Sequence, residues 1–227
     1  MDRATVDVYA SAGGATSNRF QQLAPERLPL ALAGLHRAME VGGVLDLTTW
    51  WQPEPLRDLL VGAGFDIEDM RLIEPSRRRR AAHDGVLARA RRARTLPDTV
   101  GAGMRLLVCG LNPSLYAADA GVGFARPGNR FWPAARAAGL VSADRDPDHA
   151  LRHHGVGMTD LVKRATVAAD ELTTAEYRTG LARIERLVRW LCPGAVCFVG
   201  LAGWRAAVDR RAQPGSNRPA WRVCRCT

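Results

Sequence analysis

The sequence predicts an α/β protein with a three-layer fold, in which helices cover both faces of a mainly parallel central sheet, preceded by a small N-terminal α/β fragment. Two short apolar runs, at residues 106–109 and 195–199, are typical of buried strands of a parallel sheet. A long helix is expected between them, because residues 174–191 carry an apolar stripe at helical spacing. That stripe consists of Tyr177, Leu181, Ile184, Val188 and Leu191.

The composition of the chain limits the kinds of fold and binding partner that are possible. The chain has 227 residues, 47% of them hydrophobic, so it can bury one large core or two small ones. Its formal charge of +9 favours a polyanionic partner, although charge alone does not separate DNA from RNA or an anionic membrane. No apolar stretch approaches the roughly 20 residues of a membrane span, and the N-terminus lacks a signal-peptide pattern. We therefore expect a soluble protein of the cytoplasm without membrane contact. We also expect a monomer, associated with the nucleoid if its polyanionic partner is DNA.

Four segments are expected along the chain. Residues 1–75 form the N-terminal fragment, 76–95 a basic linker, 96–215 the main domain and 216–227 an atypical tail. In the fragment, helices are expected over residues 29–39 and 56–61, and strands over 44–47 and 67–73. The linker carries two arginine clusters and has two equally weighted interpretations: a solvated connector, or an arm that contacts phosphates.

The stretch from residue 104 to residue 132 holds the candidate site. Its strand stops at Gly110, and Asn112 and Pro113 follow directly, which predicts a tight loop at the strand's carboxyl end. Open α/β sheets build their ligand crevices at such ends. Further on, Asn129 precedes a second predicted helix and is either its cap or a support for the site loop.

These residues carry a family resemblance. GLNPS at 110–114, GVGF at 121–124 and PGNRFW at 127–132 resemble, in order and spacing, the mismatch-specific uracil/thymine DNA glycosylases, the Mug/TDG branch of the uracil-DNA glycosylase superfamily. The resemblance covers about residues 96–211 and includes GMTDLV at 157–162. It implies a DNA repair enzyme that flips uracil, or thymine, out of G·U or G·T mismatched double-stranded DNA and cuts its N-glycosidic bond.

The resemblance also implies roles for particular residues. Asn112 would be the catalytic residue; its amide is neutral, so it would position the attacking water instead of deprotonating it. Backbone N–H groups near Leu111 and Phe124 would address the base, and the Phe124 ring would stack on it. The full set expected at the substrate is Gly110, Leu111, Pro113, Ser114, Tyr116, Ala117, Phe124 and Asn129, with Arg130, Lys163 and Arg164 expected on the DNA.

Several of these assignments have alternatives. Lys163 and Arg164 could equally be solvated surface cations. Ala117 stands where some relatives carry a serine facing the base, which leaves the acceptance of thymine open. Asp160 stands where relatives carry lysine or asparagine, and the effect of a carboxylate there is open. Asp119 is expected to face solvent, away from Asn112.

No cofactor and no metal are expected. The cysteines lack the CxxC spacings of an iron–sulfur cluster, and Cys109 and Cys197 are expected to be buried and inert. His149 and His153 are expected to be surface residues because no further ligands can be placed beside them. Residues 35–50 and 56–65 resemble the carboxyl half of a class I S-adenosylmethionine-dependent methyltransferase, but no glycine-rich loop follows a first strand, which predicts a remnant without cofactor.

The end of the chain departs from the family pattern. Relatives continue with another strand and a loop close to NPSG that wedges into the duplex, and residues 216–227 contain no such loop. A frame slip in GC-rich coding DNA can produce a tail of this composition, and this is our hypothesis for its origin. Two alternatives to the enzyme therefore stand: a truncated, non-catalytic DNA-binding or vestigial product, and an active methyltransferase.

Overall fold

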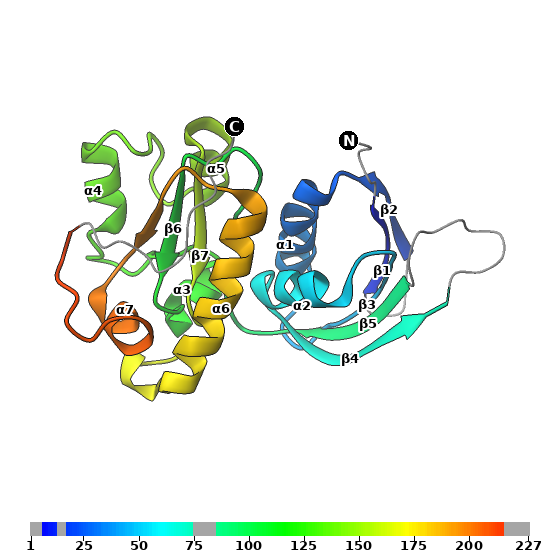
Figure 1. Cartoon of the computed structure of the whole chain (residues 1–227). Coiled ribbons are helices and arrows are strands. Elements are labelled where there is room, and N and C mark those ends of the chain that lie inside the picture. Colours follow the sequence, from blue (N-terminus) through cyan, green and yellow to red (C-terminus); the bar gives the residue numbers. More distant parts are fainter. Residues whose placement is uncertain (1–5, 13–16, 75–84, 216–227) are drawn as a thin grey trace. The chain divides into compact units, whose positions relative to one another are not determined.

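The chain divides into two units, residues 1–93 and residues 94–227. The computed structural model describes residues 6–12, 17–74 and 85–215 (Figure 1). Among these residues no helix combines the length and the apolar character that a membrane crossing requires. The expected tail at 216–227 lies outside the described residues.

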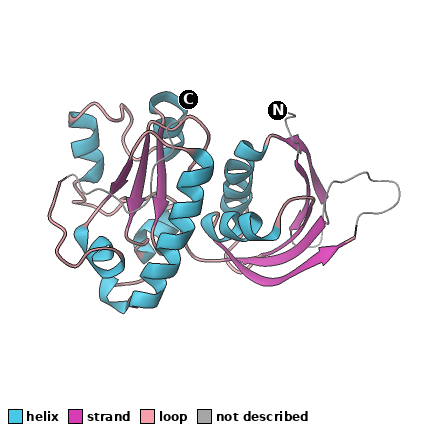
Figure 2. Ribbon diagram, in the orientation of Figure 1, coloured by secondary structure: helices cyan, strands magenta, loops and turns pink. Residues whose placement is uncertain are grey.

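The N-terminal unit is built on an antiparallel sheet. Its five strands, in the order β2-β1-β3-β5-β4, are β1 (Val6–Ala12), β2 (Ser17–Leu23), β3 (Val44–Thr49), β4 (Phe65–Ile73) and β5 (Gly85–Arg92). A 3₁₀ turn (Pro25–Arg27) leads into α1 (Leu28–Ala38), and α2 (Pro53–Gly62) follows β3. Both helices pack on one face of the sheet, where Leu32, Leu45, Leu60 and Phe65 are almost fully buried (Figure 2). The helices and strands predicted for residues 29–73 are confirmed; α1 has the predicted length, shifted by one residue, and α2, β3 and β4 are longer than predicted.

The expected linker at 76–95 is wrong for residues 85–92, which form β5, a strand between β3 and β4. Ala88 and Ala90 point into the core, while Arg89 and Arg91 point outward. Arg89 pairs with Asp46 and Arg91 with Glu68, each at 2.7 Å. These two arginines therefore belong to a strand of the folded unit and not to a connector, and each has a carboxylate partner. The other arginine cluster, at residues 77–80, lies outside the described residues.

The methyltransferase resemblance stays a prediction. The segment that could have held a glycine-rich loop, at residues 13–14, is outside the described part of the chain. Every strand pair described in this unit is antiparallel.

The C-terminal unit is built on a parallel sheet. Its strands, in the order β7-β6-β8, are β6 (Leu106–Gly110), β7 (Val156–Asp160) and β8 (Val196–Phe198). Its helices are α3 (Leu115–Ala120), α4 (Phe131–Ala137), α5 (Pro147–His154), α6 (Thr174–Leu191) and α7 (Leu201–Ala207), with a 3₁₀ turn at Ala169–Glu171.

Helices cover both faces of this sheet. Leu107 and Cys109 of β6 pack in one cluster with Ile184 of α6. Val108, which points the other way, packs in a second cluster with Trp132 of α4 and Ala150 of α5. Figure 1 shows α6 and α4 on opposite sides of the strands. The predicted three-layer arrangement around a parallel sheet is therefore confirmed for this unit.

The helix predicted over residues 174–191 is confirmed with both ends as expected. It begins with a capping box, in which Thr173 and Glu176 each accept a hydrogen bond from the other's backbone N–H. It approaches β7 closely at Gly180, where an added Cβ would collide with the Leu161 carbonyl oxygen. A larger residue at this position would push α6 away from the end of β7.

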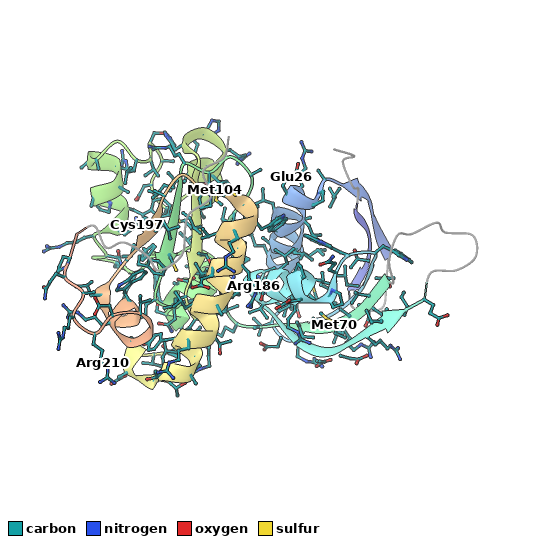
Figure 3. The ribbon with its side chains drawn as sticks, viewed as in Figure 1. Glu26, Met70, Met104, Arg186, Cys197 and Arg210 are labelled. Atoms are coloured by element: carbon teal, nitrogen blue, oxygen red, sulfur yellow. The ribbon has the colours of Figure 1, made fainter. Side chains whose placement is uncertain are left out.

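The strand predicted over residues 195–199 is present but is not buried. Val196 and Phe198 are half-exposed, and Cys197 is exposed (Figure 3). The physical reason is the uncovered edge of β8: it pairs only with β6 among the described strands, whereas the other outer strand, β7, is also bridged by Thr99. The prediction of a buried Cys197 is therefore wrong. Cys109, in the central strand, is buried as predicted, and burial raises the pKa of its thiol well above the usual value.

Candidate active site

The amide of Asn112 is clamped from three directions. Asn112 lies in the loop after β6, and its Nδ2 donates to the Thr166 hydroxyl at 2.8 Å, the Arg164 carbonyl at 3.0 Å and the Pro113 carbonyl at 3.2 Å. Two of these partners are backbone carbonyls, which can only accept. Reversing the amide would set its oxygen against both, so the partners fix its orientation.

The other end of the Asn112 amide is free. Its Oδ1 accepts no hydrogen bond from the described part of the chain, and the residue is half-buried. A fixed carbonyl oxygen with an unused acceptor can hold a water molecule in one place. The predicted chemistry of Asn112 therefore has a geometric basis.

The segment after β7 holds this loop by its backbone. The Thr166 N–H donates to the Pro113 carbonyl, and the Leu115 N–H donates to the Thr166 carbonyl, both at 3.2 Å. Leu111 accepts from the Val162 N–H at 2.9 Å, while its own N–H has no acceptor within the described residues. That N–H is available for a ligand, as the resemblance implies.

Phe124 stands in a strained loop beside the site. Its φ of 58° lies in the left-handed region, which residues with a side chain rarely adopt. The Trp132 indole holds this loop by donating to the Gly123 carbonyl at 2.8 Å, and the Phe124 ring stacks on Phe131 at 4.2 Å. A Cβ added to Gly110 would lie 3.4 Å from the tip of the Phe124 ring, so the ring lies at the start of the Asn112 loop.

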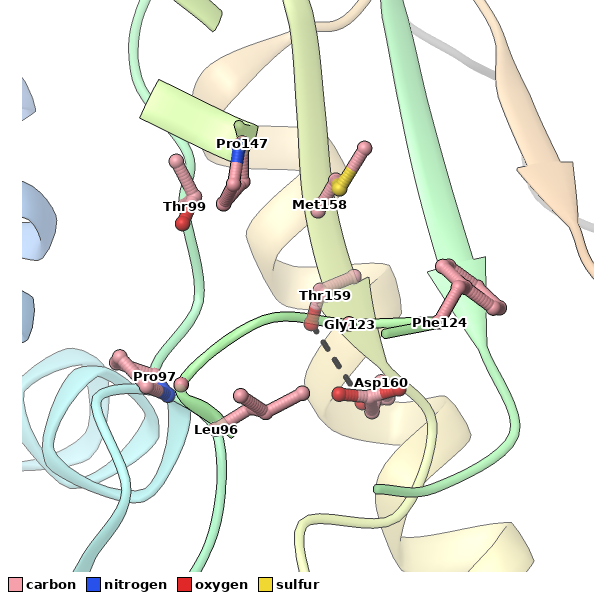
Figure 4. Close-up of a pocket in the computed structure, with 10 residues that line it drawn as sticks. Leu96, Pro97, Thr99, Gly123, Phe124, Pro147, Met158, Thr159 and Asp160 are labelled. Atoms are coloured by element: carbon pink, nitrogen blue, oxygen red, sulfur yellow. Dashed lines mark hydrogen bonds between the residues drawn. The ribbon is translucent and has the colours of Figure 1, made fainter. Parts of the chain in front are cut away.

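A small pocket opens next to this ring. Leu96, Pro97, Met158 and Phe124 contribute its apolar walls, and Asp160 contributes a carboxyl group (Figure 4). All of these residues belong to the C-terminal unit. The Phe124 ring and the Asp160 carboxyl group thus meet beside Gly110, at the carboxyl ends of β6 and β7, where the Asn112 loop begins.

Asp160, the last residue of β7, brings an ionisable group to this pocket. Its carboxylate oxygen lies so close to Gly110 that a Cβ there would collide with it. No donor from the described residues binds the carboxylate. Burial raises the pKa of Asp160 to about 6, against the attraction of the nearby Lys163 and Arg183 charges.

A buried ionic cluster lies behind Asp160. The Asp98 carboxylate accepts from Lys163 Nζ at 2.8 Å, the Arg183 guanidinium at 2.7 Å and the Thr159 hydroxyl at 2.7 Å. Arg183 also donates to the backbone carbonyl of Asp160 at 2.8 Å. Burial alone would raise the pKa of Asp98, but the two cations and the hydrogen bonds hold it below its usual value.

Of the expected DNA contacts, Lys163 is not available as assigned, and Arg164 stays a prediction. The Lys163 side chain is only 9% exposed and is bound to Asp98, because the chain brings that carboxyl group next to it from 65 residues away. Arg164 extends to the start of α6, where it pairs with Glu176 at 2.7 Å. Arg164 still contributes to the site, through its backbone carbonyl. Arg130 is exposed and makes no ion pair with the described residues, so its assignment stays a prediction.

Several expected substrate residues serve the loop itself. The Ser114 hydroxyl caps α3 by accepting from the Ala117 N–H at 3.2 Å, and the Asn129 oxygen accepts from the Phe131 N–H at 2.9 Å, which favours the cap interpretation. Pro113 and Ala117 are buried, and Tyr116 is half-exposed. Asp119 pairs with Arg94 on the surface, which confirms that it faces solvent.

Sequence patterns did not select Thr166, Asp98 or Arg183. Thr166 and Asp98 act on residues more than 50 positions away, and Arg183 falls between the stripe positions Leu181 and Ile184 of α6. The only available signal was the placement of Asp98 and Thr166 just before and just after the pocket strands.

No metal site is formed by the described residues. No three of their His, Cys, Asp or Glu side chains could hold an ion together. The His149 and His153 rings lie 4.4 Å apart on α5 without a further ligand of this kind.

The clamped amide, whose oxygen can hold a water molecule, thus lies in the loop after β6, and the Phe124 ring lies at the start of that loop, at the carboxyl end of a parallel sheet. Residues 97–222 match the uracil DNA glycosylase superfamily. The chain belongs to this superfamily, and membership implies a uracil-DNA glycosylase type of activity on DNA. The match continues beyond Gly215 into the segment expected to be atypical.

Proposed function

We propose that this protein is a monofunctional, mismatch-directed uracil-DNA glycosylase. It hydrolyses the N-glycosidic bond of uracil opposite guanine in double-stranded DNA and leaves an abasic site. The observation that carries the proposal is the clamped amide of Asn112, which leaves its carbonyl oxygen without a donor in the loop that begins at Gly110, beside the Phe124 ring. Mismatch preference and branch rest on the resemblance of the loop sequences.

In the proposed reaction the base leaves before the water has fully bonded. The bond between the sugar C1′ and the base N1 breaks, and its electron pair stays with the base. A water held by the Asn112 carbonyl oxygen then bonds to C1′ and loses a proton to solvent. Because the amide is neutral, its contribution is positioning, and this requires the fixed orientation that the clamp provides.

The departing base needs donors for its growing negative charge. The backbone N–H groups of Leu111 and Phe124 have no acceptor among the described residues and fit this role. A preorganised donor of this kind contributes about 3 kcal/mol to the transition state. The Phe124 ring offers a surface for the flipped base, where stacking is worth roughly 1–3 kcal/mol.

The environment of one lysine supports the proposal that the enzyme does not cut the DNA strand. A glycosylase that also cuts the strand needs an amine nucleophile at the sugar. Lys163 is the only lysine in the sequence, and its amine is bound to the buried Asp98 carboxylate. The side chains described here therefore supply no such nucleophile, which supports a monofunctional enzyme.

The proposal is tested on a labelled duplex with one G·U pair, with enzyme in excess and alkali used to reveal abasic sites. Wild type should convert the substrate only to an alkali-labile product, and Asn112→Ala should be slower by at least about 100-fold. Asp119→Asn, which alters a surface carboxyl outside the site, should match wild type. Equal traces for wild type and Asn112→Ala would refute the proposal. The same assay on a G·T duplex decides whether thymine is released.

A further inference from the structure

One ionisable group in the pocket has no role in the reaction described above. Asp160 ends β7 beside Gly110, the last residue of β6. Its carboxylate oxygen lies over Gly110, and the tip of the Phe124 ring lies over the same residue. A base stacked on Phe124 would therefore have this carboxyl group close to it.

The structure holds the backbone of Asp160 but not its carboxylate. Arg183 donates to the Asp160 carbonyl oxygen at 2.8 Å, and the β6–β7 ladder fixes the strand. No hydrogen bond or ion pair within the described residues satisfies the carboxylate. An unpaired carboxyl group in a partly enclosed, largely apolar pocket is costly to keep charged, unless a ligand supplies the missing partner.

The nearby cations do not neutralise Asp160, because Asp98 already engages them. Lys163, from the segment after β7, and Arg183, from α6, both direct their charges to the Asp98 carboxylate. Asp98, from the segment before β6, itself repels a charge on Asp160, and Cys109 of β6 is held neutral. These groups together leave the pKa of Asp160 at about 6, with burial as the largest cause.

The two forms of this carboxyl group would act in opposite ways on a departing base. As the bond to the sugar breaks, negative charge spreads onto the carbonyl oxygens of uracil. A protonated carboxyl group can donate a hydrogen bond to such an oxygen, whereas a carboxylate only accepts and repels the charge. The hydrogen bond strengthens during the reaction without transfer of the proton, so the leaving base takes only the electron pair of the broken bond.

We propose that Asp160 is a catalytic residue that acts in its protonated form, as a hydrogen-bond donor to the departing base, and that this makes the enzyme faster in mildly acidic solution than above neutrality. The inference rests on the proposed glycosylase function. It differs from the role of Asn112, which is neutral at every working pH. Asp160 would therefore be the group that gives this site its pH dependence.

The test compares wild type, Asp160→Asn and Asp160→Val on the G·U duplex between about pH 5 and pH 8.5. Enzyme is saturating and single turnovers are measured, so DNA affinity does not enter. The wild-type rate should fall by at least about tenfold as the pH rises through about 6. Asp160→Asn keeps a donor at every pH, so its rate should be flat across this range and should exceed the wild-type rate at the alkaline end. Asp160→Val should be flat and slow.

The outcomes separate the two proposals. If wild type releases uracil with a pH profile that Asp160→Asn does not change, the inference about Asp160 is wrong and the proposed function stands. If wild type releases no uracil at any pH, the proposed function fails and the inference fails with it. Asp119→Asn serves as the control and should keep the wild-type profile, since its carboxyl group lies on the surface.

Discussion

The ends of the neighbouring strands β6 and β7 carry two polar side chains that differ in how the protein binds them. After β6, the Asn112 amide is held by three acceptors and cannot change charge. At the end of β7, the Asp160 carboxylate is held by no described residue, and burial raises its pKa to about 6. The first side chain is fixed in space and constant in charge, and the second is free to respond to a ligand or to protons.

The difference shows that a site can separate positioning from electrostatics. Asn112 needs hydrogen-bond partners because its function depends on direction. Asp160 can change its charge near pH 6 only because its carboxylate has no hydrogen-bond partner, since a partner would shift its pKa and hold it in one charge state. The buried ionic cluster explains why the Asp160 carboxylate has no partner. Asp98 binds the side chains of Lys163 and Arg183, and Asp160 receives only a hydrogen bond from Arg183 to its backbone carbonyl.

The largest expected effect comes from removing the centre of that cluster. Asp98→Ala leaves two cations buried without their counter-charge, which should destabilise the C-terminal unit by about 3–5 kcal/mol. Hydrogen exchange of the β6 and β7 amides measures this unit alone. Asp46→Ala removes the partner of Arg89 in an exposed pair of the other unit and should cost at most about 1 kcal/mol. Equal losses would show that Asp98 has no special structural role.

The next effect tests whether the Asn112 clamp depends on a donor. Asn112→Asp places an acceptor against the Arg164 and Pro113 carbonyls, which should cost about 2 kcal/mol locally. We expect uracil release at pH 7.5 to fall by at least about tenfold, although an aspartate is a better base than an amide. A faster Asn112→Asp variant would mean that the clamp does not hold this side chain during the reaction.

A smaller effect sharpens the contrast at Asp160. The pKa of Asp160 is raised to about 6 in the folded chain, so folding favours the protonated form, and ionisation above that pH lowers stability. Asp160→Asn should therefore stabilise the C-terminal unit at pH 7.5 by about 1–2 kcal/mol, discounted for partial exposure. The gain should shrink as the pH falls through 6 and should vanish near pH 4. Thermal unfolding at several pH values measures it; a gain independent of pH would contradict the assignment.

The smallest effect removes one contact of the clamp. Thr166→Val keeps the shape of the side chain but removes the hydroxyl that accepts from Asn112 at 2.8 Å. Two backbone acceptors remain, so we expect a loss of about 1 kcal/mol, or roughly fivefold in rate at constant DNA affinity. Thr173→Ala, a helix-cap change at the start of α6, is the matched control: it should lower stability by about 1 kcal/mol without a specific loss of rate.

The sequence predicted those parts of the fold whose patterns are local. The apolar stripe of α6 and the run at β6 have clear periodicities, and both elements are where they were predicted. In β5 the alternation of Ala88 and Ala90 with Arg89 and Arg91 was present in the sequence. The density of charge there suggested a linker, because the acidic partners Asp46 and Glu68 lie on other strands.

The sequence predicted the loops that form the candidate site, but not the residues that hold these loops in place. GLNPS and the loop carrying Phe124 are contiguous motifs, so Asn112 and Phe124 could be selected by inspection. Asp98, Thr166 and Arg183 act only through contacts that folding creates, and the same contacts withdraw Lys163 from the surface where a cation was expected. Whether a basic residue is free to bind phosphate depends on such partners, which a linear pattern does not contain.

The clamp on Asn112 has a consequence for how this site can drift during evolution. Two of its three anchoring atoms are carbonyl oxygens, which every residue type possesses. Selection on this contact therefore places almost no constraint on which amino acid occupies position 164, provided that the main chain keeps its conformation. A comparison of related sequences would therefore underestimate the importance of this segment, because the segment contributes a main-chain conformation and not a conserved side chain.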